Sequence, residues 1–226
     1  MKRVIDQAIV LRRVNYGESD RVVTLLTKNN GKISVFAKSA RKQKSRLSGG
    51  IELLSISEIG YIDGKSGLKT LTSANLLKHF DGIVKDIEKT KQVFDALKQV
   101  EKLSDDGAGQ EYFDPLETYM SSLGEDSFDK DLVEVWFRLQ LLSIAGVLGN
   151  IKVRHMSPVR DETMYSFNYD KQFFEGDLSG VFSKNDIKLL RLLGSHRTPI
   201  RLDKELNGRN NLLNFTKTLF AMNLSL

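Results

Sequence analysis

The sequence has no cysteine, three prolines, three histidines and one tryptophan among its 226 residues. Without cysteine, the chain can form no disulfide, thiol nucleophile or cysteine-based zinc or iron–sulfur site. His79, His155 and His196 lie far apart, and none has a metal-type neighbour three or four residues away. The sequence therefore predicts no cofactor, no metal site and no catalytic residue, and an enzyme is the least favoured class of function.

Long apolar runs are also missing. The most apolar stretch, Leu139–Leu148, has about ten residues and is too short to span a bilayer. An acid at Asp6 comes too early for a signal peptide, and no long apolar core follows it. These features predict a protein of the cytoplasm.

Acidic residues are absent from Arg21 to Ile51, and the cations of this stretch become dense between Lys38 and Arg46. A cationic loop that leaves a strand favours phosphate binding, because each Lys or Arg can displace a condensed counterion from a polyanion. A solvated charged loop without a ligand is the alternative interpretation. Charge also divides the chain: residues 1–80 hold 15 Lys and Arg against 6 Asp and Glu, a net +9, whereas residues 81–226 are net −4. This asymmetry suggests two modules with different partners.

The first part of the chain has the alternation and turn signals of short β-strands. Asn30-Gly31 is typical of a tight hairpin, and Gly17 and Gly49-Gly50 mark other turns. Five strands joined by such turns fit a small closed barrel, of OB type or, as an alternative that the pattern leaves open, SH3-like. The predicted strands are residues 7–14, 21–27, 32–38, 51–62 and 68–73.

Beyond about residue 75 the apolar spacing becomes helical, starting at Leu76, Leu77 and Phe80. The predicted helices cover residues 83–100, 112–123, 129–148, 186–193 and 210–222. Residues 150–180 lack this spacing and are predicted to be irregular. The predicted fold is α+β and multidomain, with an N-terminal OB-type β-barrel (1–80) followed by an all-α helical domain (81–226), which carries an irregular, cysteine-free insert near 150–182.

Several segments of the first 80 residues occur together, in order and at a specific spacing: Ala8-Ile-Val-Leu11, Tyr16-Gly-Glu-Ser-Asp-Arg-Val-Val-Thr-Leu-Leu-Thr27, Gly31-Lys-Ile-Ser34, Ala37-Lys-Ser-Ala-Arg-Lys-Gln-Lys-Ser-Arg46 and Leu68-Lys-Thr-Leu-Thr72. In these segments the chain resembles the RecO family of bacterial recombination-mediator proteins. Leu139-Gln-Leu-Leu-Ser-Ile-Ala-Gly-Val-Leu-Gly149 also resembles the central helix of that family.

The resemblance implies a DNA-binding OB domain (1–80) and a role in DNA repair and recombination through the RecF pathway, at the nucleoid of a bacterial cell. It implies binding to single- and double-stranded DNA and annealing of complementary strands. It also implies help, together with RecR, in loading RecA onto DNA coated by single-strand-binding protein, with no enzymatic turnover. Many relatives carry a four-cysteine zinc site after the central helix. Here residues 155–174 have none, and the aromatics of Tyr165–Phe174 suggest that ring packing replaces the metal.

The expected DNA-binding residues are the cations that match the family's basic barrel surface, together with Tyr16, which lies in a polar turn beside Arg12 and Arg13 and is suited to stacking on a base. The set is Arg13, Tyr16, Arg21, Lys32, Lys38, Arg41, Lys42, Lys44 and Arg46. Phe36 is a second aromatic candidate, for which a core role is equally expected. A groove for the tail of single-strand-binding protein is hypothesised at Lys152, Arg154 and Arg160, where a solvated loop is the alternative.

Two other functions stay open at the level of sequence. An RNA-binding OB protein would show the same pattern and charge, and competition between RNA and single-stranded DNA would separate it from a DNA-binding mediator. A protein-interaction adaptor without DNA binding is disfavoured by the basic loop, since such a barrel has no need of clustered cations.

Overall fold

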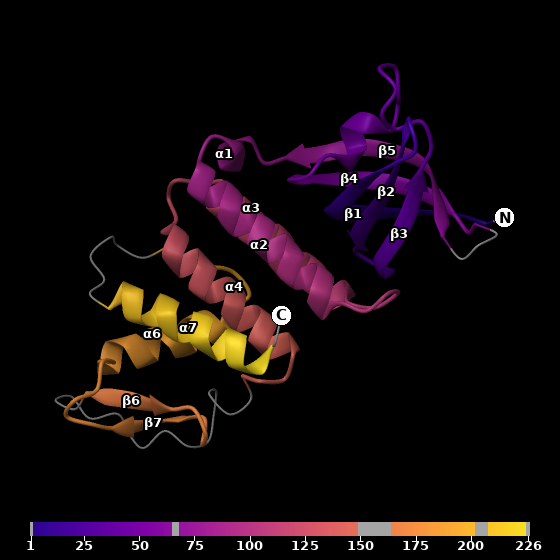
Figure 1. Ribbon diagram of the computed structural model, residues 1–226. Helices are drawn as coiled ribbons and strands as arrows, with labels where there is room; N and C mark the ends of the chain where they lie inside the picture. Colours follow the sequence, from indigo (N-terminus) through magenta and orange to yellow (C-terminus); the bar gives the residue numbers. More distant parts are fainter. Residues whose placement is uncertain (1, 65–67, 149–163, 202–207, 225–226) are drawn as a thin grey trace. The chain divides into compact units, whose positions relative to one another are not determined.

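The structure is a computed structural model that describes residues 2–64, 68–148, 164–201 and 208–224 (Figure 1). It divides into two compact units, Met1–Gly124 and Glu125–Leu226. The first unit contains a β-barrel with its own helices, and the second is mainly helical. No helix of the described residues is long and apolar enough to cross a membrane.

Five strands form a closed barrel in the order β1-β2-β3-β5-β4, in which β4 pairs back onto β1. They are β1 (Arg3–Tyr16), β2 (Asp20–Thr27), β3 (Gly31–Ala37), β4 (Ser55–Ile62) and β5 (Lys69–His79). This is the five-stranded barrel of an OB-type fold, which confirms the predicted fold class over the SH3-like alternative. Alternate side chains fill the interior, among them the fully buried Val23, Leu25, Val35 and Ile59.

The barrel closes along a short seam. Among the described residues, the strand pairs of the barrel are antiparallel except β3 with β5, which are parallel and pair at Val35 with Lys69 and at Phe36 with Thr70. The other end of β3 is covered from outside the barrel, because the amide of Lys32 donates to the carbonyl of Ala108 (2.8 Å) and Gly107 donates to the carbonyl of Lys32 (2.7 Å). This closure leaves no long unpaired edge on β3.

The predicted fourth strand begins later than expected. Residues 48–51 form a short 3-10 helix, η1 (Ser48–Ile51). Leu54 has a positive φ of 61°, which breaks the extended backbone just before β4 begins at Ser55. Ile51 is fully buried in the barrel core. This position is apolar because its side chain packs inside the barrel, and not because it lies on the buried face of a strand. Gly50 passes so close to β5 that an added Cβ would lie 2.5 Å from the carbonyl oxygen of Ala74.

The prediction that Leu76, Leu77 and Phe80 begin a helix was wrong. β5 continues to His79, paired with β4 from Ser55 onward. Leu76 and Leu77 are about half exposed, so their spacing does not report a buried helical face. Pairing with a neighbouring strand overrode the local pattern.

In its described residues, the rest of the first unit contains three α-helices and a short 3-10 helix: α1 (Asp81–Val84), α2 (Ile87–Leu103), η2 (Gln110–Tyr112) and α3 (Phe113–Leu123). The Asp86 carboxylate caps α2 by accepting from the amides of Glu88 and Lys89. Helix α2 packs on β1, and Arg12 of that strand pairs with Glu101 of the helix at 2.8 Å. The barrel strands end at the predicted boundary after residue 80, whereas the compact unit extends to Gly124. A DNA-binding domain confined to residues 1–80 therefore stays a prediction.

The second unit is built on α4 (Lys130–Ile144), which packs on α6 (Lys184–Ser195) and α7 (Arg209–Asn223). The central place predicted for this helix within its unit agrees with the full burial of Trp136, whose indole Nε1 donates to the carbonyl of His196 (3.0 Å). Gly146, at a φ of 78°, follows the helix, which ends earlier than the predicted residue 148.

Residues 165–176 were predicted to be irregular, and the structure corrects this. They form a two-stranded antiparallel hairpin, β6 (Tyr165–Asn168) and β7 (Phe173–Gly176). Its rings pack on α7, with the Phe167 and Phe215 centroids 4.8 Å apart and those of Phe174 and Phe215 5.5 Å apart. The expected aromatic packing is present; that it stands in place of a zinc site stays a prediction.

Candidate nucleic-acid interface

The basic loop, defined as residues 38–46 between β3 and η1, is fixed at its start to the turn between β1 and β2. Ser39 has a positive φ of 55°, and its amide donates to Asp20 Oδ1 at 2.6 Å. The backbone amide of Arg41 donates to the carbonyl of Ser19 (2.9 Å). The Arg41 guanidinium donates to the carbonyl of Gly17 (3.2 Å). The start of the basic loop and the β1–β2 turn therefore form one surface.

The basic loop is also tied down from inside. Ala40 is buried in the barrel core, and Leu47, just past the loop, packs against it. Turn hydrogen bonds run from the Lys42 amide to the Ser39 carbonyl (3.2 Å) and from the Ser45 amide to the Lys42 carbonyl (2.9 Å). With the small residues held inward, the cationic side chains between them are left exposed.

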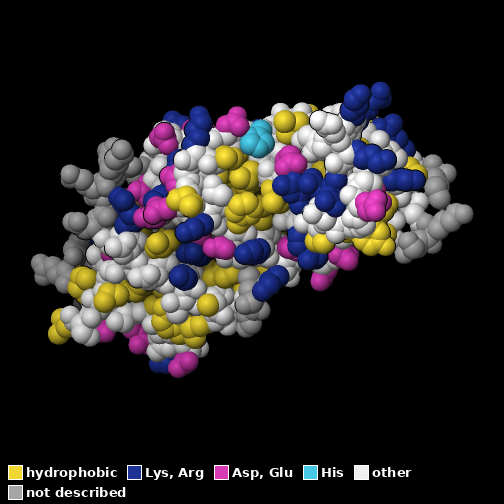
Figure 2. Space-filling model, turned by 45° about the horizontal axis from the view of Figure 1, so that its top comes forward, with side chains coloured by type: hydrophobic (Ala, Val, Ile, Leu, Met, Phe, Trp, Pro, Cys, Tyr) yellow, Lys and Arg dark blue, Asp and Glu magenta, His cyan; other side chains and the backbone are white. Residues whose placement is uncertain are grey.

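Four cations of the basic loop make no ion pair or hydrogen bond through their side chains within the described part of the chain. They are Lys38, Lys42, Lys44 and Arg46. Figure 2 shows Lys and Arg side chains gathered over the barrel, at the right of the view. A cation that makes no ion pair is available to an external anion, since no internal partner has to be displaced.

Arg13 and Arg21 share one acidic partner, Glu52. Arg13 Nη1 contacts Glu52 Oε2, and Arg21 Nη1 lies 3.5 Å from Glu52 Oε1. Both arginine side chains are largely covered, with exposed fractions of 28% and 20%. Their charge is therefore partly neutralised before any ligand arrives.

Lys32 lies apart from the other predicted cations. It sits at the opposite end of β3 from the basic loop, where its Nζ donates to the carbonyl of Glu101 (2.9 Å) and lies 3.6 Å from Asp106 Oδ1. Only 14% of its side chain is exposed. In this structure Lys32 ties β3 to the end of α2.

An aromatic face lies next to the basic loop. Tyr16 ends β1, is 59% exposed, and meets Phe36 of β3 edge to face with ring centroids 5.6 Å apart. Val22 pairs with Val14 on one side and with Phe36 on the other, which places all four residues on the outer face of β1–β3. Aromatic rings on an open strand face can stack on unpaired bases.

The structure thus brings Tyr16, Arg41 and the four unpaired cations to the end of the barrel at which β1 and β3 end, pairs Arg13 and Arg21 with Glu52, and separates Lys32. The role of Glu52 was not predicted, although its position as the first acid after the acid-free stretch was a usable signal. Lys152, Arg154 and Arg160 lie outside the described residues. Within the described ranges, no three His, Asp or Glu side chains are grouped to hold a metal ion.

Comparison with known proteins places this barrel in a family. A family model described as Recombination protein O N terminal matches residues 1–80. A DNA repair protein RecO of Desulfatibacillum aliphaticivorans is 35% identical over 150 residues, which cover 65% of this chain and 58% of that protein. One from Heliobacterium modesticaldum is 38% identical over 140 residues, 62% of this chain and 50% of the relative.

The match extends past the barrel. A DNA repair protein RecO of Thermodesulfovibrio yellowstonii is 32% identical over 168 residues, covering 74% of this chain and 66% of the relative. The chain therefore spans about half to two thirds of the length of these curated relatives.

Proposed function

Because the chain belongs to the RecO family, we propose that it is a recombination mediator in DNA repair. It binds single- and double-stranded DNA through the barrel and anneals complementary strands. It helps to load RecA onto DNA coated by single-strand-binding protein, together with RecR, at the nucleoid in the bacterial cytoplasm. The proposal includes no enzymatic turnover.

The observation that carries the proposal is the tethered basic loop with four unpaired cations. Holding the backbone at Ser39, Ala40 and Arg41 before binding reduces the conformational entropy that a phosphate ligand must remove. Point charges on flexible stems bind phosphates without reading bases, so the surface accepts any sequence. Each phosphate neutralised on single-stranded DNA lowers the slope of log K against log salt by about 0.7.

Annealing follows from the same surface. Two complementary strands repel each other as polyanions, and a cationic surface that contacts both lowers this repulsion. The aromatic face formed by Tyr16 and Phe36 lies beside these cations and supplies a place where an unpaired base can stack while its backbone stays on the loop. Arg13 and Arg21 contribute in this proposal only when a phosphate replaces Glu52.

The direct test is annealing of two complementary labelled oligonucleotides across a salt series. The variant changes Arg41, Lys42, Lys44 and Arg46 to alanine. A matched control changes four exposed lysines on or next to the helices of the same unit (Lys85, Lys91, Lys98 and Lys102), so that both variants lose the same net charge. We expect salt-sensitive annealing by the wild type and the control, and a slow, nearly salt-independent rate in the loop variant.

Other outcomes would redirect the proposal. DNA binding without annealing, with RNA competing equally, would favour an RNA-binding OB protein. Equal loss of annealing in the loop variant and the control would show that net charge matters and the loop does not. The parts that involve RecA, RecR and single-strand-binding protein need a separate assay, in which RecA filament formation on coated DNA is measured with and without the chain.

A further inference from the structure

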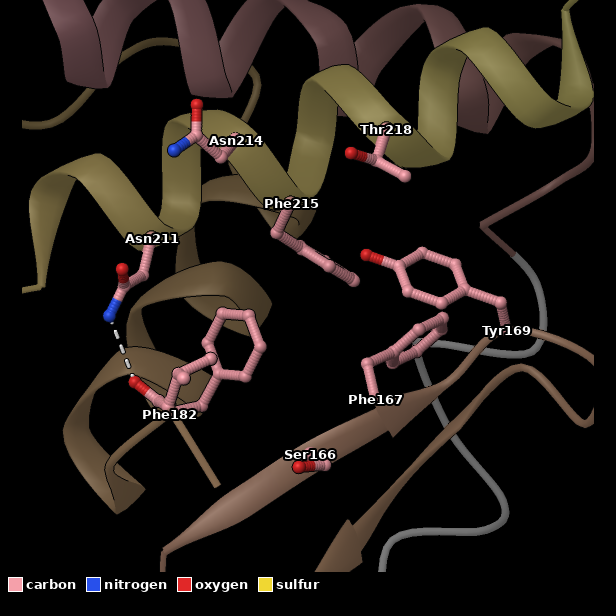
Figure 3. Close-up of a pocket in the computed structure, with 9 residues that line it drawn as sticks. Ser166, Phe167, Tyr169, Phe182, Asn211, Asn214, Phe215 and Thr218 are labelled. Atoms are coloured by element: carbon pink, nitrogen blue, oxygen red, sulfur yellow. Dashed lines mark hydrogen bonds between the residues drawn. The ribbon is translucent and has the colours of Figure 1, made fainter. Parts of the chain in front are cut away.

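The second unit contains a cavity of about 310 Å³ that plays no part in the proposed barrel surface. It lies between the β6–β7 hairpin and α7 (Figure 3). Rings from both sides form its walls, and hydroxyl and amide side chains form its rim. The lining residues that carry the argument below are Phe167, Tyr169, Phe182, Asn214, Phe215 and Thr218.

The walls are aromatic and rigid. Phe215 of α7 is the common neighbour, with ring centroids 4.8 Å from Phe167, 5.4 Å from Phe182 and 6.3 Å from Tyr169. Phe167, Phe182 and Phe215 are buried, whereas Tyr169 is partly exposed. Figure 3 shows Phe182 on one side of the space and Phe167 with Tyr169 on the other. Such walls suit a flat, uncharged ring that enters from the exposed side.

The rim offers hydrogen-bonding groups without charge. Asn211 Nδ2 donates to the carbonyl of Val181 (2.9 Å), which holds this side chain in place, and Thr218 lies beside Tyr169 in Figure 3. Asn214 is exposed, and its side chain makes no hydrogen bond within the described residues. A side-chain amide can donate one hydrogen bond to the edge of a base and accept another from it.

One cation lies beside this rim. Lys217 is exposed on α7, three residues from Asn214 and therefore on the same side of the helix. Within the described residues its side chain makes no ion pair or hydrogen bond. A ring site and a cation next to its rim residue Asn214 are the two groups that a nucleotide requires, whereas no lining residue carries a positive charge for the carboxylate of a peptide end.

We propose that this cavity is a nucleobase pocket that takes one unpaired base of single-stranded DNA, with the adjoining phosphate at Lys217. The volume lies at the lower end of the about 300–1,000 Å³ typical of small-ligand sites, which suits a single ring system. The choice of DNA as the source of the base rests on the proposed function, but the pocket itself does not depend on the basic loop. Through this pocket the second unit binds unpaired strands.

The test uses the full chain and small probes: thymidine and deoxyadenosine, their 5′-monophosphates, and deoxyribose 5-phosphate. Saturation-transfer NMR reports which ligand protons contact the protein. We expect saturation of base protons, stronger for monophosphates than for nucleosides, and none for the sugar phosphate. Asn214→Trp fills the entrance from an exposed position, and we expect it to abolish the signal without changing the melting temperature. Lys217→Ala should weaken only the monophosphates, by about two- to fivefold; Lys188→Ala, on an exposed lysine of α6, is the control.

No base-proton saturation at millimolar nucleoside, or an unchanged signal in Asn214→Trp, would overturn the pocket. So would a phenylalanine-containing peptide that saturates in the cavity where nucleosides do not. The fourfold alanine variant of the basic loop must still bind nucleosides. If the wild type binds nucleosides but does not anneal DNA, the proposed function fails while the pocket stands.

Discussion

Asp20 Oδ1 accepts a 2.6 Å hydrogen bond from the backbone amide of Ser39, and this bond joins the start of β2 to the first turn of the basic loop. Ser39 has a positive φ, a conformation that is unfavourable for a residue with a side chain. The carboxylate therefore offsets a local cost and sets the direction in which the loop leaves β3.

We expect Asp20→Ala to lower the free energy of unfolding by about 1–3 kcal/mol, because a charged hydrogen-bond acceptor is lost and the Ser39 amide is left without it. Urea unfolding and hydrogen exchange at Ser39 measure the two effects. Asp20→Asn keeps an acceptor oxygen and should retain most of the stability. Unchanged stability and exchange in the alanine variant would show that the hydrogen bonds of Arg41 and the burial of Ala40 fix the loop without Asp20.

Glu52 pairs with both Arg13 and Arg21, so in the proposed interface a phosphate has to displace its carboxylate from them. In Glu52→Gln both guanidinium groups lose their ionic partner, so we expect tighter binding to single-stranded DNA. If both arginines then contact phosphates, the slope of log K against log salt should become more negative by up to about 1.4. Fluorescence anisotropy at several salt concentrations measures both quantities.

The control for that change is Glu58→Gln, an equal loss of charge at an exposed position of β4. If the two variants bind DNA with the same affinity and the same slope of log K against log salt, the gain in affinity comes from net charge. The ion pairs of Glu52 with Arg13 and Arg21 then have no special effect. If Glu52→Gln binds single-stranded DNA more weakly than the wild type, Glu52 supports the interface by positioning Arg13 and Arg21.

Gly31 and Gly17 both have positive φ, but they differ in their surroundings. A Cβ on Gly31 would lie 2.3 Å from the carbonyl oxygen of Ala108, whereas a Cβ on Gly17 would meet nothing within 4 Å. We expect Gly17→Ala to cost about 1–2 kcal/mol from backbone strain alone, and Gly31→Ala to cost more because the contact between β3 and residues 107–108 must open. Denaturant unfolding of the two variants tests this order, and an equal cost would contradict it.

Stability should fall at alkaline pH. Burial raises the pKa of Tyr61, Tyr112 and Tyr169 above 10.0. Lys69 opposes this rise for Tyr61 and Thr218 opposes it for Tyr169, whereas nearby carboxylates add to it for Tyr61 and Tyr112. Above pH 10 the unfolded chain releases phenolic protons that the folded chain keeps, so rising pH favours unfolding. The stabilisation is fully present below pH 10 and is lost as pH rises through the folded pKa values.

Urea midpoints measured between pH 8 and pH 11 test this expectation. Tyr112→Phe and Tyr169→Phe remove one titrating group each and should flatten the decline for the unit that carries the change, after correction for their own effect at pH 8. A decline of the same steepness in both variants would assign the alkaline loss to other groups.

The barrel could be predicted from the sequence because its signals are local. Alternating apolar residues and turns such as Asn30-Gly31 determine the strands by themselves. The extension of β5 to His79 could not be predicted this way, since it depends on pairing with β4, and the spacing of Leu76 and Leu77 pointed to a helix. The β6–β7 hairpin was missed for a similar reason: its short strands pack on Phe215, a partner distant in sequence.

The candidate interface was predictable only as a count of charges. A dense cationic run in a loop is visible in the sequence, and so is the exposure of Lys42 and Lys44 that this implies. The sequence does not show which cations are already neutralised, because Glu52 reaches Arg13 and Arg21, and Asp106 reaches Lys32, only in the folded chain. Three-dimensional pairing therefore sorts the predicted cations into available and engaged ones.

The short seam between β3 and β5 also bears on how the chain folds during synthesis. The strands β1, β2 and β3 pair in sequence order, but the seam joins residues about 34 positions apart, such as Val35 and Lys69. The nascent chain therefore exposes the edge of β3 until β5 has left the ribosome. Exposed edges invite pairing with other chains, and lysines at an edge oppose it. Lys32 and Lys38 lie near the two ends of this edge. We expect their charge to oppose aggregation of the nascent chain before β5 has paired.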